Sequence, residues 1–188
     1  MTTYIALLRG INVSGQKLIR MANLKQSCVD LMLQDVRTYL QSGNVVFCTQ
    51  QTDTHKLAAL LRDRIAQDFG HAVEVLVLSE QAFNLVANAN PLRPLSGGDE
   101  KLFHVTFLSQ PVSEDRFQTL KLPLQAGEQA ILAGQVIFLY CPHGYGKTKL
   151  SNGFFEKALG VSATTRNWRT MRALVDLCTP SQKVLARK

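Results

Sequence analysis

The spacing of apolar residues over the first 78 positions constrains the fold more than any other feature of this sequence. Runs typical of strands are found at residues 4–8, 36–41, 45–49 and 73–78. Apolar residues at helical spacing predict helices over residues 21–32 and 57–69, and Gly70 follows the second as a C-terminal cap. The resulting order, β-α-β-β-α-β, is that of ferredoxin-like folds. We therefore expect a four-stranded sheet with both helices on one face.

A segment rich in proline and glycine, residues 88–98, predicts a boundary in the middle of the chain. We expect a ferredoxin-like lobe at 1–88, a linker at 89–100 and a smaller α+β lobe with a basic C-terminal region at 101–188. A short helix at 79–87 would close the first lobe. The second lobe is predicted to contain, in order, a strand at 102–108, a helix at 113–120, a hairpin at 128–133 and 135–141, and helices at 150–159 and 166–178. The fold class is therefore α+β with two lobes.

The positive charge is concentrated at the C-terminal end of the chain. The formal net charge is +7, yet residues 1–142 hold 12 basic and 12 acidic residues, and residues 143–188 hold 9 basic and 2 acidic residues. Such a basic segment favours a polyanionic partner. Lys183, Arg187 and Lys188 are interpreted as a solvated tail.

Other residue patterns argue against a membrane protein and against a metalloprotein. No apolar run approaches the ~18–20 residues of a membrane-spanning helix. The four cysteines are dispersed without a C-x-x-C pair, which favours a reduced, cytoplasmic protein. The four histidines are equally dispersed, so we expect neither a metal nor another cofactor.

Two loops of the first lobe carry candidate binding residues. Residues 9–15 connect a strand to a helix through a loop with two glycines, which can present backbone N–H groups to an anion. Arg9 and Asn12 are the side chains expected to point at such a ligand. Ser42 and Asn44 flank the glycine of a predicted hairpin turn, and they would line the same site if the two loops meet. The alternative is that both segments are ordinary connections.

A third candidate segment, residues 141–149, partly matches the phosphate-binding P-loop. Gly146-Lys147-Thr148 fits the end of that motif, but Cys141 stands where its first glycine is required. An NTPase is therefore not indicated, although Lys147, Thr148 and Lys149 remain candidate phosphate ligands. His143 in the same loop is a candidate general acid or base. A plain surface loop is the alternative.

The fourth segment, residues 164–170, is predicted to open the last helix. Trp168 lies on the apolar arc of that helix and is interpreted as a core residue. Arg166, Arg169 and Arg172 would form a separate arc, either a solvated face or an anion-binding face, with Asp176 able to pair with Arg172. Because a basic residue at a helix N-terminus opposes the helix dipole, Arg166 points toward function rather than helix stability.

Taken together, these segments resemble a known bacterial family. The motifs are LLRGINV at 7–13, MA at 21–22, VRTYLQSGNVVF at 36–47, NP at 90–91, FL at 107–108, GYGKTKL at 144–150 and TRNWRT at 165–170. In order and spacing the chain closely resembles the family called "domain of unknown function 1697" over nearly its whole length. Ser14 and the Lys147-Thr148 pair depart from the family pattern. The resemblance implies a two-lobed α+β fold with a ferredoxin-like first part, and it supplies no catalytic residue.

The sequence leads to three functional hypotheses. The preferred one is a cytoplasmic protein that binds a phosphate-bearing partner, nucleic acid or nucleotide, in the absence of a metal. The binding residues would be Arg9, Asn12, Ser42, Asn44, Lys147, Thr148, Lys149, Arg166, Asn167 and Arg169. The second is a small enzyme acting on an anionic metabolite in a closed cleft, with His143 or Lys147 in proton transfer. The third is an interaction module for an acidic protein partner.

Overall fold

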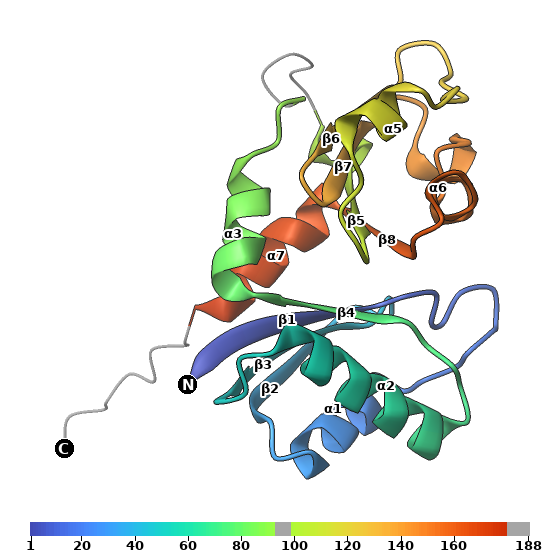
Figure 1. Ribbon diagram of the computed structural model, residues 1–188. Coiled ribbons are helices and arrows are strands. Elements are labelled where there is room, and N and C mark those ends of the chain that lie inside the picture. Colours follow the sequence, from blue (N-terminus) through green and yellow to red (C-terminus); the bar gives the residue numbers. More distant parts are fainter. Residues whose placement is uncertain (93–98, 180–188) are drawn as a thin grey trace.

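The computed structural model describes residues 1–92 and 99–179. Half of the predicted linker, residues 93–98, lies outside the described residues, as do Lys183, Arg187 and Lys188. Two four-stranded antiparallel sheets form the framework (Figure 1), so the expected α+β fold with two lobes is confirmed. None of the described helices is both long enough and apolar enough to cross a lipid bilayer.

The first lobe has the predicted ferredoxin-like order. Its elements are β1 (Thr2–Leu8), α1 (Met21–Asp30), β2 (Gln34–Tyr39), β3 (Asn44–Thr49), α2 (Thr54–Phe69) and β4 (Val75–Ser79). The strands lie in the order β2-β3-β1-β4. Strand β1 alternates between two cores: Tyr4, Ala6 and Leu8 pack with α1 and α2, and Ile5 and Leu7 pack toward the second lobe.

Local signals explain the boundaries of α2. The side chain of Asp53 accepts hydrogen bonds from the backbone N–H groups of His55 and Lys56, which satisfies two unpaired donors of the first turn. Gly70 ends the helix at φ 68°, a left-handed conformation that glycine adopts without a Cβ clash. The predicted helix and its C-terminal cap, Gly70, are therefore confirmed, and the helix begins three residues earlier than predicted, after the N-cap Asp53.

The second lobe contains a second sheet with the strand order β6-β7-β5-β8. Its elements follow α3 (Glu80–Asn88) and are η1 (Glu100–Leu102), β5 (Phe103–Leu108), α5 (Glu114–Gln118), β6 (Gln129–Ala133), β7 (Val136–Tyr140), η2 (Tyr145–Lys147), α6 (Asn152–Leu159), β8 (Ala163–Asn167) and α7 (Trp168–Cys178). The predicted hairpin corresponds to β6 and β7.

The predicted start of the last helix, at Arg166, is wrong. Residues 163–167 form β8, which pairs with β5 so that Thr165 lies opposite Thr106. Neighbouring threonines favour a strand, and the side chain of Asn167 accepts a hydrogen bond from the Arg169 N–H as the N-cap of α7. Helix α7 therefore begins at Trp168, and Arg166 extends from a strand rather than from the arginine arc of the helix.

The two sheets share one hydrophobic core. Helices α3 and α7 lie between the sheets (Figure 1), and both sheets contribute apolar side chains to the cluster around these helices. Trp168 is buried there as expected, and the rings of Phe83 in α3 and Phe107 in β5 stack at 6.0 Å. Helices α1 and α2 cover the far face of the first sheet, and α5 and α6 cover that of the second. The lobes are therefore fused through their inner layer.

We expect Phe107→Ala to destabilise both lobes together. Removing a buried phenylalanine leaves a cavity and costs about 3–5 kcal/mol, and this cavity lies in the shared core. Urea unfolding followed by Trp168 fluorescence and by far-UV circular dichroism should give one coincident, shifted transition. Leu85→Ala, at a position 67% exposed on α3, should change stability by less than about 0.5 kcal/mol. Two separate transitions, of which only one shifts, would contradict the shared core.

Candidate functional site

The Arg166 guanidinium lies at the junction of the two lobes and is 6% exposed. It donates to the Asn44 Oδ1 atom, to the carbonyl oxygens of Leu8 (2.7 Å), Ser42 (3.2 Å) and Gly43 (3.3 Å), and within β8 to Thr164 Oγ1 and the Thr165 carbonyl. Strand β8 of the second sheet is thus tied to the end of β1 and to the β2–β3 turn. The sequence-predicted residues Ser42, Asn44 and Arg166 do come together here.

Arg166 is held by neutral acceptors. Within residues 1–92 and 99–179, no carboxylate forms an ion pair with it. Burial lowers the pKa of Arg166 from 12.5 to about 10, so the guanidinium remains charged at neutral pH. Asn44 is fully buried, and its amide N–H groups donate to the Tyr39 carbonyl and to Ser42 Oγ. The polar atoms of this cluster are therefore engaged with one another rather than directed at solvent.

The loop after β1 is also organised by internal contacts. Asn12 adopts φ 54°. Its amide nitrogen donates to the carbonyls of Ile19 (3.0 Å) and Gln41 (2.8 Å), and its oxygen accepts from the Ile19 N–H. Arg9 donates to the Ala163 carbonyl and forms an ion pair with Glu156 of α6. Both side chains were expected to face a ligand, and both instead connect protein segments.

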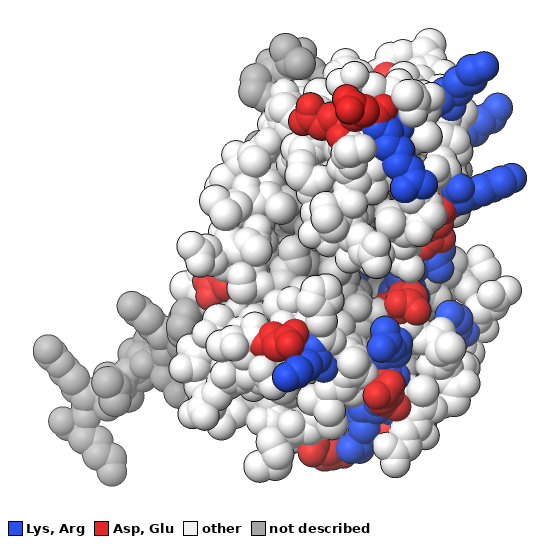
Figure 2. All heavy atoms as spheres, in the orientation of Figure 1, with Lys and Arg blue, Asp and Glu red and all other residues white. Residues whose placement is uncertain are grey.

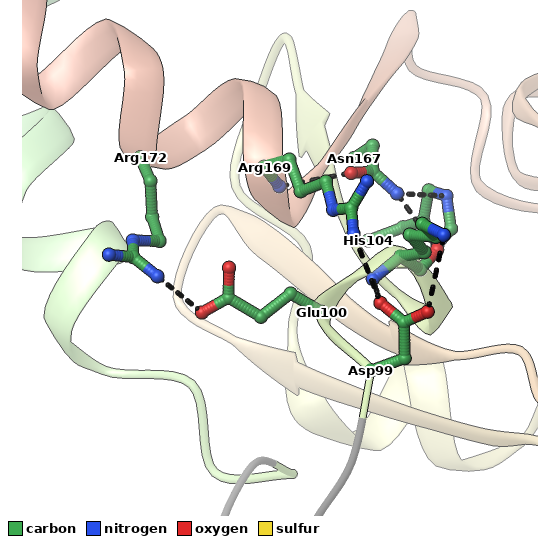
Figure 3. Close-up of polar contacts among 7 residues, drawn as sticks. Asp99, Glu100, His104, Asn167, Arg169 and Arg172 are labelled. Carbon is green, nitrogen blue, oxygen red and sulfur yellow. Dashed lines mark hydrogen bonds and ion pairs between the residues drawn. The ribbon is translucent and has the colours of Figure 1, made fainter.

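The arginines of α7 are paired with the segment that precedes β5 (Figure 3). Arg172 forms an ion pair with Glu100 at 2.7 Å, and Arg169 lies 3.5 Å from Asp99. Arg172 thus has Glu100 as its partner in place of the expected Asp176. Both arginines are more than half exposed. Their positive charge is partly neutralised, which weakens the case for an anion-binding arginine face.

Asn167 has a structural role beside these arginines. Besides capping α7, its amide nitrogen donates to the Lys101 carbonyl at 2.9 Å and lies 3.2 Å from His104 Nε2. Figure 3 shows Asn167 and His104 pointing toward one another. Asn167 therefore joins α7 to β5, and none of the hydrogen bonds described for it involves Lys147, Thr148 or Lys149.

An aromatic pair, the buried His104 and the half-buried Tyr145, was not singled out from the sequence. The two rings stack at 4.7 Å. Burial lowers the pKa of His104 to about 4 and raises the pKa of Tyr145, so both side chains are neutral at pH 7. The signal for Tyr145 was present, since it stands between Gly144 and Gly146 inside the candidate loop. The burial of His104 depends on a strand pairing that no local pattern reveals.

Four lysines of the second lobe differ from the arginines of α7 in having no acidic partner among the described residues. Lys121, Lys147, Lys149 and Lys157, called here the lysine edge, are exposed, and none lies within 4.0 Å of a carboxylate of the described residues. Gln125 donates to the Lys147 carbonyl, which joins the loop after α5 to η2. Basic side chains project from this part of the second lobe in Figure 2.

The remaining candidates of this loop are Thr148 and His143. Thr148 is half-buried, and its hydroxyl oxygen accepts a hydrogen bond from the Leu150 N–H. The ring of His143 is exposed and lies 3.0 Å from the Ala126 carbonyl. No carboxylate or nucleophile among the described residues hydrogen-bonds to this ring.

A cleft of about 690 Å³ separates the lobes along strand β4, and Figure 2 shows the surface hollowed there. Neither His143 nor Lys147 lines it. Burial raises the pKa values of the Cys28, Cys141 and Cys178 thiols to about 12, so these thiols are protonated and poorly nucleophilic. Over the described parts of the chain, no three His, Cys, Asp or Glu side chains gather in a way that could hold a metal ion.

Comparisons with known proteins support the fold and leave the activity open. The model of the family described as "Protein of unknown function (DUF1697)" matches residues 1–138, so the motifs at 144–150 and 165–170 lie beyond the match. The structure of conserved bacterial protein SP0830 from Streptococcus pneumoniae is similar, with a TM-score of 0.71 and 24% identity over 94% of this chain and 98% of that chain. A search of curated proteins found no match.

We expect Arg166→Met to lower stability by about 1–3 kcal/mol for each buried acceptor left without a donor. Arg166→Lys should also be destabilising, because one ammonium group cannot reproduce the planar fork of a guanidinium. The matched substitution Arg169→Met removes an exposed ion pair and should cost no more than about 1 kcal/mol. Urea unfolding measures all three. Equal stability of the Arg166 and Arg169 variants would show that the junction does not depend on Arg166.

His104 should make the protein less stable in acid. Its pKa is about 4 in the folded protein, against about 6.5 in the unfolded chain, so between these values the unfolded chain binds a proton that the folded protein does not. Unfolding free energy should therefore fall as the pH drops from 6.5 to 4, at up to about 1.4 kcal/mol per pH unit from this group. In His104→Phe that contribution should vanish. An identical pH dependence in the variant would contradict the assignment.

Proposed function

Because this chain belongs to a family of proteins of unknown function, we propose a function from its own surface: binding of a phosphate-bearing partner through the lysine edge. The supporting observation is that four exposed lysines there have no carboxylate within 4.0 Å among the described residues. Such ammonium groups retain their full charge for a ligand, since no internal partner neutralises it.

Two acids of the second lobe are already engaged elsewhere. Glu156, on the same helix as Lys157, pairs with Arg9, and Glu128 is buried, with one carboxylate oxygen accepting from the Gln125 N–H. Lysine contacts to phosphate are independent of base sequence and release counterions. A nucleic acid is favoured over a free nucleotide, because the four lysines are exposed and none of them lines the cleft between the lobes.

The enzyme hypothesis has less support. A general acid or base must come within hydrogen-bond reach of the bound substrate, and neither His143 nor Lys147 lines the cleft between the lobes. We therefore prefer a cytoplasmic binding protein. Arg9, Asn12, Ser42, Asn44 and Arg166 then hold the framework that presents the lysine edge.

Replacing Lys147 and Lys149 by alanine should weaken binding of a fluorescein-labelled single-stranded oligonucleotide, measured by anisotropy at low salt. Each lost phosphate contact should reduce the slope of log K against log salt concentration by about 0.7–0.9, and the loss should be similar for all base sequences. The matched control Lys25→Ala/Lys56→Ala removes two exposed lysines of the first lobe and should leave affinity nearly unchanged.

Two results would overturn the proposal. One is the absence of binding by the wild-type protein to DNA and RNA at low salt. The other is an equal loss of affinity in both double variants, which would reflect net charge alone and not the lysine edge.

A further inference from the structure

Strand β4 is an edge strand whose outer side is open. Arg9 N–H donates to the Glu74 carbonyl at 2.9 Å, in the register of β1 with β4. Because bonded pairs alternate along an antiparallel ladder, Glu74, Leu76 and Leu78 bond to β1. The N–H and C=O groups of Val75 and Val77 therefore point away from β1, and no described residue pairs with them.

Strand β8, one of the two edge strands of the second sheet, has outward-facing backbone groups that side chains occupy. The Ala163 carbonyl on β8 accepts from Arg9 Nε, and the Ala163 N–H donates to Glu156. Side chains thus occupy hydrogen-bonding groups of β8 that another strand could otherwise use. Proteins commonly block their sheet edges in such ways. Strand β4 differs from β8 in that no described residue occupies its outward N–H and C=O groups.

The open edge of β4 forms the floor of the cleft between the lobes. Residues 74–79 all line this cleft of about 690 Å³, which is within the usual range of about 300–1,000 Å³ for ligand sites. One wall is the first half of α2, and the other combines α3 with the end of β5 and the β6–β7 turn. Five strand residues at ~3.4 Å each would span about 17 Å of it.

The two walls differ in chemistry. On the α2 side the cleft is lined by Thr54, His55, Ala58 and Arg62, and on the opposite side the apolar lining includes Ala82, Val86, Phe107 and Val136. Side chains of a strand added beside β4 would alternate between these walls, as those of Val77 and Leu78 alternate between the two cores. Small or polar residues suit the α2 wall, and apolar residues suit the other.

Charge and shape limit what can occupy the cleft. Arg62 and Glu74, which both line it, lie 4.0 Å apart and offset one another, so the cleft favours an uncharged occupant over a polyanion. A second copy cannot supply the added strand through its own β4, because that β4 is recessed between the same two walls. A flexible, extended segment can enter.

We propose that the cleft binds an extended peptide segment, apolar and small polar residues alternating, as a fifth strand hydrogen-bonded to Val75 and Val77. None of the lysine-edge residues lines this cleft. Peptide binding here therefore does not depend on the function proposed above. The mode is strand addition, in which backbone hydrogen bonds supply affinity and alternate side chains supply specificity.

The test begins with random heptapeptides displayed on phage and selected against the full-length protein. Enriched peptides should show the alternating pattern. The best peptide is then synthesised with single N-methyl groups at successive positions. Methylation at positions whose N–H faces β4 should weaken binding at least about tenfold, whereas methylation at the positions between them should have little effect, because only alternate N–H groups face the partner strand.

Variants locate the peptide on the protein. Ala82→Trp fills the cleft from α3 and should weaken binding at least about tenfold, whereas Leu85→Trp, exposed on the same helix outside the cleft, should change it by less than about twofold.

Amide hydrogen exchange of Val75 and Val77 should slow on peptide addition, as expected for newly hydrogen-bonded N–H groups. Failure to enrich any peptide, undiminished binding to Ala82→Trp, or unchanged exchange at both valines would each overturn the proposal. Should Ala82→Trp not fold, the methylation pattern and the exchange rates decide.

Discussion

A buried guanidinium that forms no ion pair with any described carboxylate joins the two sheets. Removing Arg166 from water carries a large desolvation cost, which the fold offsets with neutral oxygen atoms from β8, from the end of β1 and from the β2–β3 turn. Arg166 and its acceptors in the first lobe are more than 120 residues apart in the chain, so the contact forms only when both sheets are in place. The positions of the loop after β1 and of α6, which Arg9 joins, follow from this junction.

Several arginines of this chain hold segments of the fold together, whereas the four residues of the lysine edge are exposed to solvent. A guanidinium presents five N–H groups in one plane and can satisfy several carbonyls at once, and Arg9, Arg37 and Arg166 all donate to main-chain carbonyls. An ammonium is a compact and strongly hydrated charge, and the four residues of the lysine edge remain in solvent. Basic residues of this chain therefore serve two roles, and the four residues of the lysine edge, which have no carboxylate within 4.0 Å among the described residues, remain available to a partner.

The first lobe was predictable from sequence because its strands and helices have clear apolar periods, and because Gly70 marks the end of α2. Strand β8 was not, because a short polar run such as Ala163–Asn167 becomes a strand only by pairing with β5, some 60 residues earlier. The same limit applies to the candidate site. Local spacing identified Arg166 and Asn44 as unusual, yet their burial against one another is a tertiary property, and so is the recess along β4.

The position of α7 has a consequence for biosynthesis. The face of the first sheet that carries Ile5, Leu7 and Val46 packs in the cluster that contains Trp168, Met171 and Leu174. Chains emerge from the ribosome N-terminus first, at roughly 5–20 residues per second, so this face is complete as an apolar surface long before the helix that covers it is made. While residues 80–167 are being synthesised, α7 cannot yet cover this apolar face of the first sheet. Chaperone protection therefore matters more for the nascent chain than for the finished molecule.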